Sequence, residues 1–272
     1  MNPAQIYRLQ GSLRLQLLEL YFKANAGHIG CSLSCIDLML GSMILEKAET
    51  EAFILSKGHA AAALYVCLYH TGEISAELLD TFYKDGTTLS AHPAPNKFKG
   101  IPFATGSLGH GLPIGTGIAQ ANKLLQNGEF VYVLMSDGET NEGTTWEAGH
   151  FAVSNRLDNL IVLIDKNGLQ GFGYTQDVLG DSAESKKWKA LGFEVFEIDG
   201  HDVLAIQETI QQCKVSTIPK PKAIIATTVK GKGVSYMENK MEWHYLPMSA
   251  DLYEVAKQDV YERYLTETTA VV

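Results

Sequence analysis

The stretch that decides the fold is FVYVLMSDGETNEGTTWEAGHFAVSNRLDNLIVLIDKNGLQ, residues 130–170. It contains two continuous apolar runs, at 130–135 and 159–165, and a segment at 144–154 whose apolar residues have helical spacing. Short continuous apolar runs are typical of parallel strands that are buried on both faces. Two parallel strands need a crossover connection, which is usually a helix. The stretch therefore predicts a strand–helix–strand unit.

The same alternation continues on both sides of this unit. The remaining patterns predict helices at 6–23, 35–45, 60–70, 108–126, 203–213 and 250–264, and strands at 52–55, 193–198 and 222–227. A polar section at 81–105 predicts a long loop, and long loops in compact domains are usually functional. No repeat or low-complexity linker divides the chain. We therefore expect residues 1–272 to form a single α/β domain, doubly wound, with a mainly parallel sheet and helices on both faces.

Composition excludes several classes of partner. The chain has 272 residues, of which 46% are hydrophobic, and a formal net charge of -9. Without a basic run, nucleic acid and acidic membrane surfaces are not expected partners, and an anionic ligand must be held by local groups. The four cysteines form no CxxC or zinc-spaced set, which favours buried or free thiols. No apolar run approaches the ~18 residues of a membrane span, and no cleavable signal pattern is present. These features predict a soluble, cytoplasmic protein.

Polar residues follow the two strands of the opening stretch. Ligands of open parallel sheets bind at the carboxyl ends of the strands, where Asp137 and Asn167 stand. A carboxylate, an amide oxygen and a backbone carbonyl near Leu169 suit Mg²⁺, which also takes phosphate oxygens from a ligand. Gly138 permits close backbone approach, and the helix that follows presents its N-terminus to an anion. A magnesium-bound diphosphate fits, although Asp, Asn and Gly are also ordinary turn residues.

The stretch resembles the thiamine diphosphate signature, Gly-Asp-Gly followed further along by Asn, with Ser136 in place of the first glycine. DGETNEG is similar to the transketolase version of this signature. Other segments agree in order and spacing, namely AGHIGCSLSCIDLM, LSKGHAAAALYVCLYHTG, SAHP, TGSLGHGLPIGTGIA and VKGKGVSYMENKMEWH. The resemblance spans residues 13–244. It implies the diphosphate-binding domain of the thiamine diphosphate fold, with thiamine diphosphate and Mg²⁺ as cofactors.

The resemblance also assigns the cofactor contacts. Asp137, Asn167 and the carbonyl of Leu169 are implied to bind Mg²⁺, with Asn167 and Gly138 beside the cofactor's diphosphate. His59 is implied to contact the diphosphate as well. The loop that lies beside the cofactor's aminopyrimidine in the family corresponds to Gly106, Ser107 and Leu108.

Further histidines and acids match substrate and interface positions. His28 and His92 match residues that contact the sugar, and His244 matches a histidine that reaches both the diphosphate and the substrate. Imidazole suits these roles because it donates and accepts protons near neutral pH. Glu142 and Glu147 match glutamates near the subunit interface that link two active sites, although both are also ordinary acids of the first helical turns.

Two positions depart from the family's pattern. His110 stands where Gln is common, and Tyr245-Leu246 stand where relatives commonly have glycine and a basic residue. These departures leave the sugar open among pentose phosphates and specialised sugars, including branched or sulfonated ones. We expect His70, His150 and His201 to be structural.

The chain carries the motifs of only the first of the family's domains. The resemblance therefore implies the N-terminal subunit of a two-subunit transketolase, which moves a two-carbon ketol unit from a ketose to an aldose. A separately encoded C-terminal subunit would complete the enzyme as an α2β2 heterotetramer. The alternatives are a subunit of a deoxyxylulose phosphate synthase or 2-oxo acid dehydrogenase, or a silent module that keeps the fold. TNEG and SKGHA favour transketolase.

Overall fold

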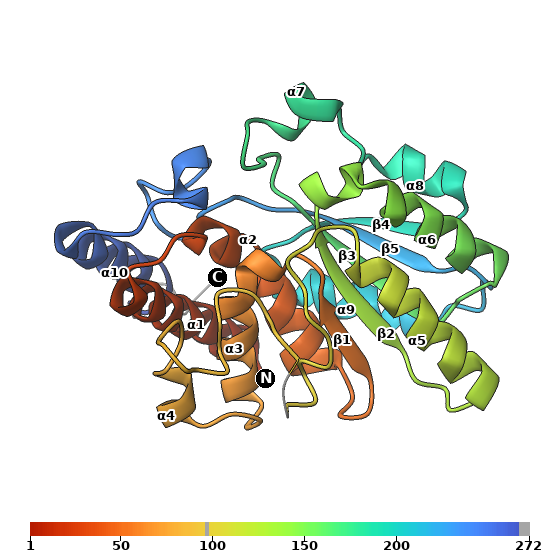
Figure 1. The fold of residues 1–272 in the computed structure, drawn as a ribbon, viewed down its shortest axis with the longest axis horizontal. Helices are drawn as coiled ribbons and strands as arrows, with labels where there is room; N and C mark the ends of the chain where they lie inside the picture. The colour runs from red at the N-terminus through yellow and green to blue at the C-terminus, as the bar shows by residue number, and fades with distance from the viewer. Residues whose placement is uncertain (96–97, 267–272) are drawn as a thin grey trace.

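The computed structural model describes residues 1–95 and 98–266. At its centre is a parallel sheet of five strands in the order β1-β2-β3-β5-β4 (Figure 1). The strands are β1 (Ala52–Leu55), β2 (Val131–Ser136), β3 (Leu160–Lys166), β4 (Glu194–Asp199) and β5 (Lys222–Thr227). The predicted parallel sheet is confirmed, and each strand lies within one residue of its expected position.

Helices cover both faces of the sheet. On one side lie α5 (Gly111–Leu125), α6 (Gly143–Ser154) and α8 (Ser185–Leu191), and on the other lie α2 (Ile29–Met39), α3 (Ala61–His70) and α9 (Val203–Val215) (Figure 1). Along β2, Val131 and Val133 belong to the first core, whereas Tyr132 and Leu134 belong to the second. Burial on both faces explains why the strands read as continuous apolar runs, and the predicted doubly wound architecture is confirmed.

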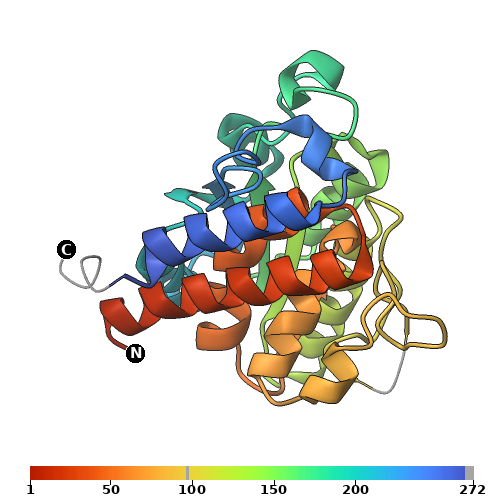
Figure 2. The same ribbon diagram turned by 90° about the vertical axis from the view of Figure 1, so that its left-hand side faces the viewer.

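Helix α1 (Pro3–Ala24) and helix α10 (Ala250–Tyr264) lie side by side as an outer layer (Figure 2). Asn2 and Gln5 form a reciprocal capping box at the start of α1, which satisfies two backbone N–H groups. The helix ends at Asn25, whose φ of 46° is left-handed. This turn leads directly to His28, which is also left-handed, with φ of 74°, and precedes α2. The predicted helix at 6–23 is confirmed and extends further at both ends.

The start of α2 differs from the prediction. The sequence placed a helix at 35–45, whereas the structure begins α2 at Ile29 and continues it as a π-helical segment, Leu40–Glu46. Every residue of α2 is buried, so no polar face marks its beginning. Together the two segments form an 18-residue apolar stretch, Ile29–Glu46, with a mean hydropathy of 1.5. This is the length and hydropathy of a membrane span, so the expectation that no apolar run approaches that length was wrong. It is 83% buried inside the fold, as a core helix is.

The remaining differences between the predicted and the observed elements lie in the connecting segments. The short helices α4 (Ala76–Leu79), α7 (Thr175–Leu179) and α8 were not predicted. The expected loop at 81–105 is confirmed for residues 81–95 and 98–105, where the structure has no helix or strand. All four cysteines are buried free thiols, as predicted. The carboxyl ends of β1, β2, β3 and β5 meet at one edge of the sheet, and the polar motifs gather there.

Candidate active site

Four of the predicted site residues bring their imidazole rings together. The centroid of His28 lies 5.8 Å from His59, 5.7 Å from His92 and 5.2 Å from His244. His59 and His244 are 5.5 Å apart and stacked. These residues come from four segments: the turn before α2, the end of β1, the long loop and the helical turn Met241–His244. We call this group the histidine cluster.

The histidine cluster is electrically neutral near physiological pH. Burial, followed by the charges of His92 and Lys230, lowers the pKa of His28 to about 4. Burial and then Lys230 lower the pKa of His244 to about 3, and burial lowers the pKa of His59 and His92 as well. Removing an imidazolium from water is costly, so each ring stays uncharged and can both donate and accept a hydrogen bond.

A buried lysine fixes the tautomer of one of these rings. The Nζ of Lys230 donates to Nδ1 of His244 at 2.9 Å and lies 3.4 Å from the carbonyl oxygen of Leu169. An ammonium group has no acceptor, so Nδ1 accepts and the ring proton resides on Nε2. Nothing in the sequence singles out Lys230, because a buried lysine looks like a surface one until its partners are known.

The loops after β2 and β3 are joined through one carboxylate. Asp137 Oδ1 accepts from the backbone N–H of Gly138 at 2.8 Å, and Oδ2 accepts from the N–H of Gly168 at 2.6 Å and the hydroxyl of Thr175 at 3.1 Å. In the second loop, Asn167 Oδ1 accepts from the N–H of Leu169 at 3.0 Å. The structure thus brings together the strand ends that carry the three predicted magnesium ligands.

This oxygen-rich edge fits a divalent cation. Asp137 is 1% exposed, and burial together with the charge of Asp165 raises its pKa to about 6. Asp165, in contrast, pairs with Lys57, and this positive charge lowers the pKa of Asp165. Within the described residues, Asp137 forms no ion pair, and no group of three His, Cys, Asp or Glu side chains could hold a metal. A cation here would use carboxylate, amide, carbonyl and ligand oxygens, the set that Mg²⁺ prefers.

A comparison with known families identifies the domain. The family model described as "Transketolase, thiamine diphosphate binding domain" matches residues 10–262. The chain belongs to the transketolase family. This match confirms the family, the fold and the thiamine diphosphate-binding character that the sequence motifs implied.

Transketolase relatives of two lengths match this chain. An apulose-4-phosphate transketolase subunit of Phocaeicola vulgatus is 39% identical over 92% of each chain. The 6-deoxy-6-sulfo-D-fructose transketolase subunit SqwG of Clostridium sp. is 36% identical over 90% of this chain and 92% of the relative. The solved transketolase of Campylobacter jejuni has a TM-score of 0.85 and 31% identity, over 96% of this chain but 43% of its own. The prediction of an N-terminal transketolase chain, a subunit of a ketol-transferring enzyme, is confirmed.

In this transketolase domain, the 106–108 loop passes between two of the cluster histidines. A Cβ on Gly58, next to His59, would lie 2.6 Å from the backbone nitrogen of Gly106. A Cβ on Gly106 would lie 2.9 Å from the ring of His92, and its φ of 136° favours glycine. The structure therefore places Gly106 against His92 and next to the residue that precedes His59, while a contact of Gly106, Ser107 and Leu108 with the aminopyrimidine stays a prediction. His110, which follows them, is exposed, and its Nδ1 lies 3.0 Å from the carbonyl oxygen of Leu108.

The acids of DGETNEG separate into buried and exposed groups. Glu139 is fully buried, accepts from the N–H of Gly109 at 2.8 Å and pairs with the Ser56 hydroxyl, so it connects the glycine loop to the end of β1. Its motif gave no sign of this role. Glu142 and Glu147, predicted to act at a subunit interface, are exposed at the start of α6 and are not part of the histidine cluster.

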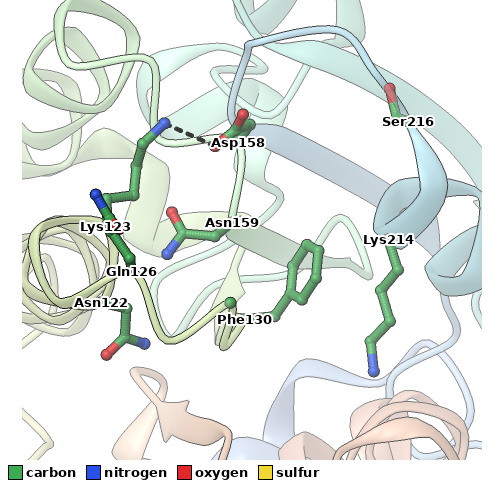
Figure 3. Close-up of a pocket in the computed structure, with 9 residues that line it drawn as sticks. Asn122, Lys123, Gln126, Phe130, Asp158, Asn159, Lys214 and Ser216 are labelled. Carbon is green, nitrogen blue, oxygen red and sulfur yellow. Dashed lines mark hydrogen bonds and ion pairs between the residues drawn. The ribbon is translucent and has the colours of Figure 1, made fainter.

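A separate cavity of about 380 Å³ lies at the amino ends of the strands (Figure 3). It contains none of the predicted site residues. Lys123 points toward Asp158 and pairs with it at 2.8 Å, and Lys214 lies on the opposite wall (Figure 3). Lys214 pairs with Glu51 at 3.2 Å. Its two lysines are thus already neutralised by the protein.

Proposed function

We propose that this chain is one half of a two-subunit transketolase and works with a separately encoded C-terminal subunit in an α2β2 heterotetramer. The relatives named as subunits match it over nearly their whole length, whereas it corresponds to 43% of the Campylobacter transketolase. The remainder of that longer enzyme is what a partner subunit would supply. The proposed reaction moves a two-carbon ketol unit from a ketose to an aldose. A cytoplasmic location stays a prediction.

The cofactor site is proposed on the edge that holds Asp137. The observation that carries this proposal is a buried carboxylate with a raised pKa and no ion-pair partner among the described residues. We infer that Asp137, Asn167 and the carbonyl of Leu169 bind Mg²⁺, and that Gly138 approaches the diphosphate. Thiamine diphosphate, when bound, supplies the electron sink for carbon–carbon bond cleavage, while the protein positions the reacting groups.

The histidine cluster supplies the proposed proton transfers. Because Lys230 occupies Nδ1 of His244, the Nε2–H of this ring is the group that can donate to an anionic or hydroxyl oxygen. We propose that His28 and His92, as neutral rings, accept hydrogen bonds from the sugar hydroxyls and so orient the protons that are transferred. We propose that His59, which is stacked on His244, donates to the diphosphate. We further propose that the exposed Glu142 and Glu147 contact a second copy of the enzyme.

The sugar is proposed to be a specialised ketose with an anionic end. Two relatives of matching length are named for apulose 4-phosphate and for 6-deoxy-6-sulfo-D-fructose, which end in a phosphate and a sulfonate. Lys57 and Lys230, the lysines beside the histidine cluster, are paired with Asp165 and His244. We therefore propose that the partner subunit recognises the anionic end.

Reconstitution tests this function. The chain is to be purified alone and with its partner subunit, and ketol transfer measured with thiamine diphosphate, Mg²⁺ and a panel of ketoses and aldoses. We expect transfer by the pair and none by the chain alone. Transfer by the isolated chain would contradict the two-subunit proposal. A pair that binds the cofactor but transfers no ketol unit would contradict the activity.

A further inference from the structure

Tyr245 lies where three segments of the active site meet. It follows His244, and its ring centroid is 4.6 Å from that ring and 6.4 Å from His28. Its hydroxyl donates to the carbonyl oxygen of Gly171 at 3.1 Å. The side chain remains 55% exposed, so the ring borders the histidine cluster without being part of the core.

Both neighbouring loops are shaped to accept this residue. A Cβ on Gly171 would lie 2.3 Å from the Tyr245 hydroxyl oxygen, and a Cβ on Gly27 would lie 2.4 Å from the Tyr245 carbonyl oxygen. Contacts this short do not occur with real side chains, so any larger residue at either position would displace Tyr245. Gly27 thus leaves room for the main chain of Tyr245, and Gly171 leaves room for the tip of its side chain.

The ring stands between the two parts of the proposed active site. On one side, the backbone N–H of His28 donates to the backbone carbonyl of His244 at 3.0 Å, which fixes the turn before α2. On the other side, the N–H of Gln170 donates to the carbonyl of Gly173 at 2.8 Å and closes the loop that begins at Leu169. Tyr245 therefore touches the histidine cluster through its ring and the loop after Leu169 through its hydroxyl.

The Tyr245 side chain offers a ligand different contacts from those of a charged residue. A tyrosine ring presents an apolar face with a polar tip, and here the tip is already occupied by Gly171. What remains for a ligand is the aromatic face, which suits the carbon chain of a sugar better than a phosphate. A wall held in place also limits the length of ligand that fits.

We propose that Tyr245 is a specificity-determining residue, whose ring contacts the carbon chain of the ketose donor and excludes donors that extend beyond it. This inference rests on the proposed transketolase function. The predicted consequence is a preference for short or branched donors over long linear ones.

The test uses the reconstituted pair with cofactor and five donors: xylulose 5-phosphate, fructose 6-phosphate, sedoheptulose 7-phosphate, apulose 4-phosphate and 6-deoxy-6-sulfo-D-fructose. The measured quantity is kcat/KM for sedoheptulose 7-phosphate divided by kcat/KM for the best donor of the wild type. Tyr245→Gly should raise this ratio by about tenfold or more, the size expected when a steric wall is removed. Tyr245→Phe keeps the ring and should leave the ratio within about threefold.

A second pair of variants tests whether the Tyr245 ring acts as a steric barrier to the donor or has only a structural role. Gly171→Ala places a methyl group against the Tyr245 hydroxyl and should displace the ring, raising the ratio in the same direction. Gly171→Ala combined with Tyr245→Phe removes the clashing hydroxyl and should restore the wild-type ratio. Calorimetry should show thiamine diphosphate affinity unchanged within about threefold throughout.

Two outcomes would overturn this inference alone, namely a wild type that already prefers sedoheptulose 7-phosphate, or variants whose losses are equal for all donors. A wild-type pair that binds the cofactor but uses none of the five donors would instead overturn the proposed function, and this inference with it.

Discussion

The two ends of the sheet carry similar residue types, but they differ in whether their charged side chains form ion pairs within the protein. At the amino ends, Lys123 and Lys214 line a cavity (Figure 3), and each pairs with a carboxylate. At the carboxyl ends, Asp137 is buried without a cation among the described residues, and the imidazoles of the histidine cluster are held neutral. A cavity whose charges are neutralised has little left to offer a ligand, whereas a buried, unpaired carboxylate is costly unless something binds it. This difference identifies the functional edge.

The carboxyl end should be much the more sensitive to the loss of one lysine. Lys57→Met would leave Asp165 buried without its counter-ion, and we expect a loss of about 3–5 kcal/mol in the free energy of unfolding. The matched change at the other end, Lys123→Met, breaks a partly exposed pair and should cost less than about 1 kcal/mol. Urea denaturation of both variants measures this. Equal losses would remove the distinction between the two ends.

Cofactor binding should depend on the same end. Asp137→Ala should weaken Mg²⁺-dependent binding of thiamine diphosphate by the reconstituted pair by at least about 100-fold, or about 2.7 kcal/mol, since a direct ligand is lost. Asp158→Ala, at the amino ends, is the control and should leave affinity within about threefold. Titration calorimetry gives both values. Unchanged affinity in the Asp137 variant would exclude it as a ligand.

The histidine cluster should make stability depend on pH. His28 has a pKa of about 4 in the folded protein, below its usual 6.5, so the unfolded chain binds more protons between these values. The free energy of unfolding should therefore fall as the pH drops from about 6.5 to about 4. Replacing His28 with Gln should reduce this slope by about 0.7 kcal/mol per pH unit, half of a full proton's effect because the ring is partly exposed. Urea denaturation from pH 4.5 to 7.5 tests this, and an unchanged slope would contradict it.

The sequence predicted the parts of the molecule that rest on local pattern. Both strands of the opening stretch and the helix between them follow from apolar periodicity, and His28, His59, His92 and His244 follow from the motifs. The start of α2 could not be predicted in this way, because a helix buried on every side has no periodicity.

Long-range pairing explains the rest of what the sequence did not reveal. Lys57, Lys230 and Glu139 are buried, and each has a role only through partners far away along the chain. The sheet order was also hidden, since β4 lies at the edge beyond β5 and no local signal fixes that crossover. The burial and the partners of charged side chains are therefore what the sequence predicts least and the structure shows most clearly.

The most direct test of the metal assignment is a crystal structure of the reconstituted pair with thiamine diphosphate and Mn²⁺ in place of Mg²⁺. Anomalous scattering from manganese locates the ion independently of the side chains. We expect one peak within about 2.0–2.3 Å of the Asp137 carboxylate, the Asn167 amide oxygen and the Leu169 carbonyl, the usual range for oxygen ligands of such ions. A manganese peak at any other place in the pair would contradict the account.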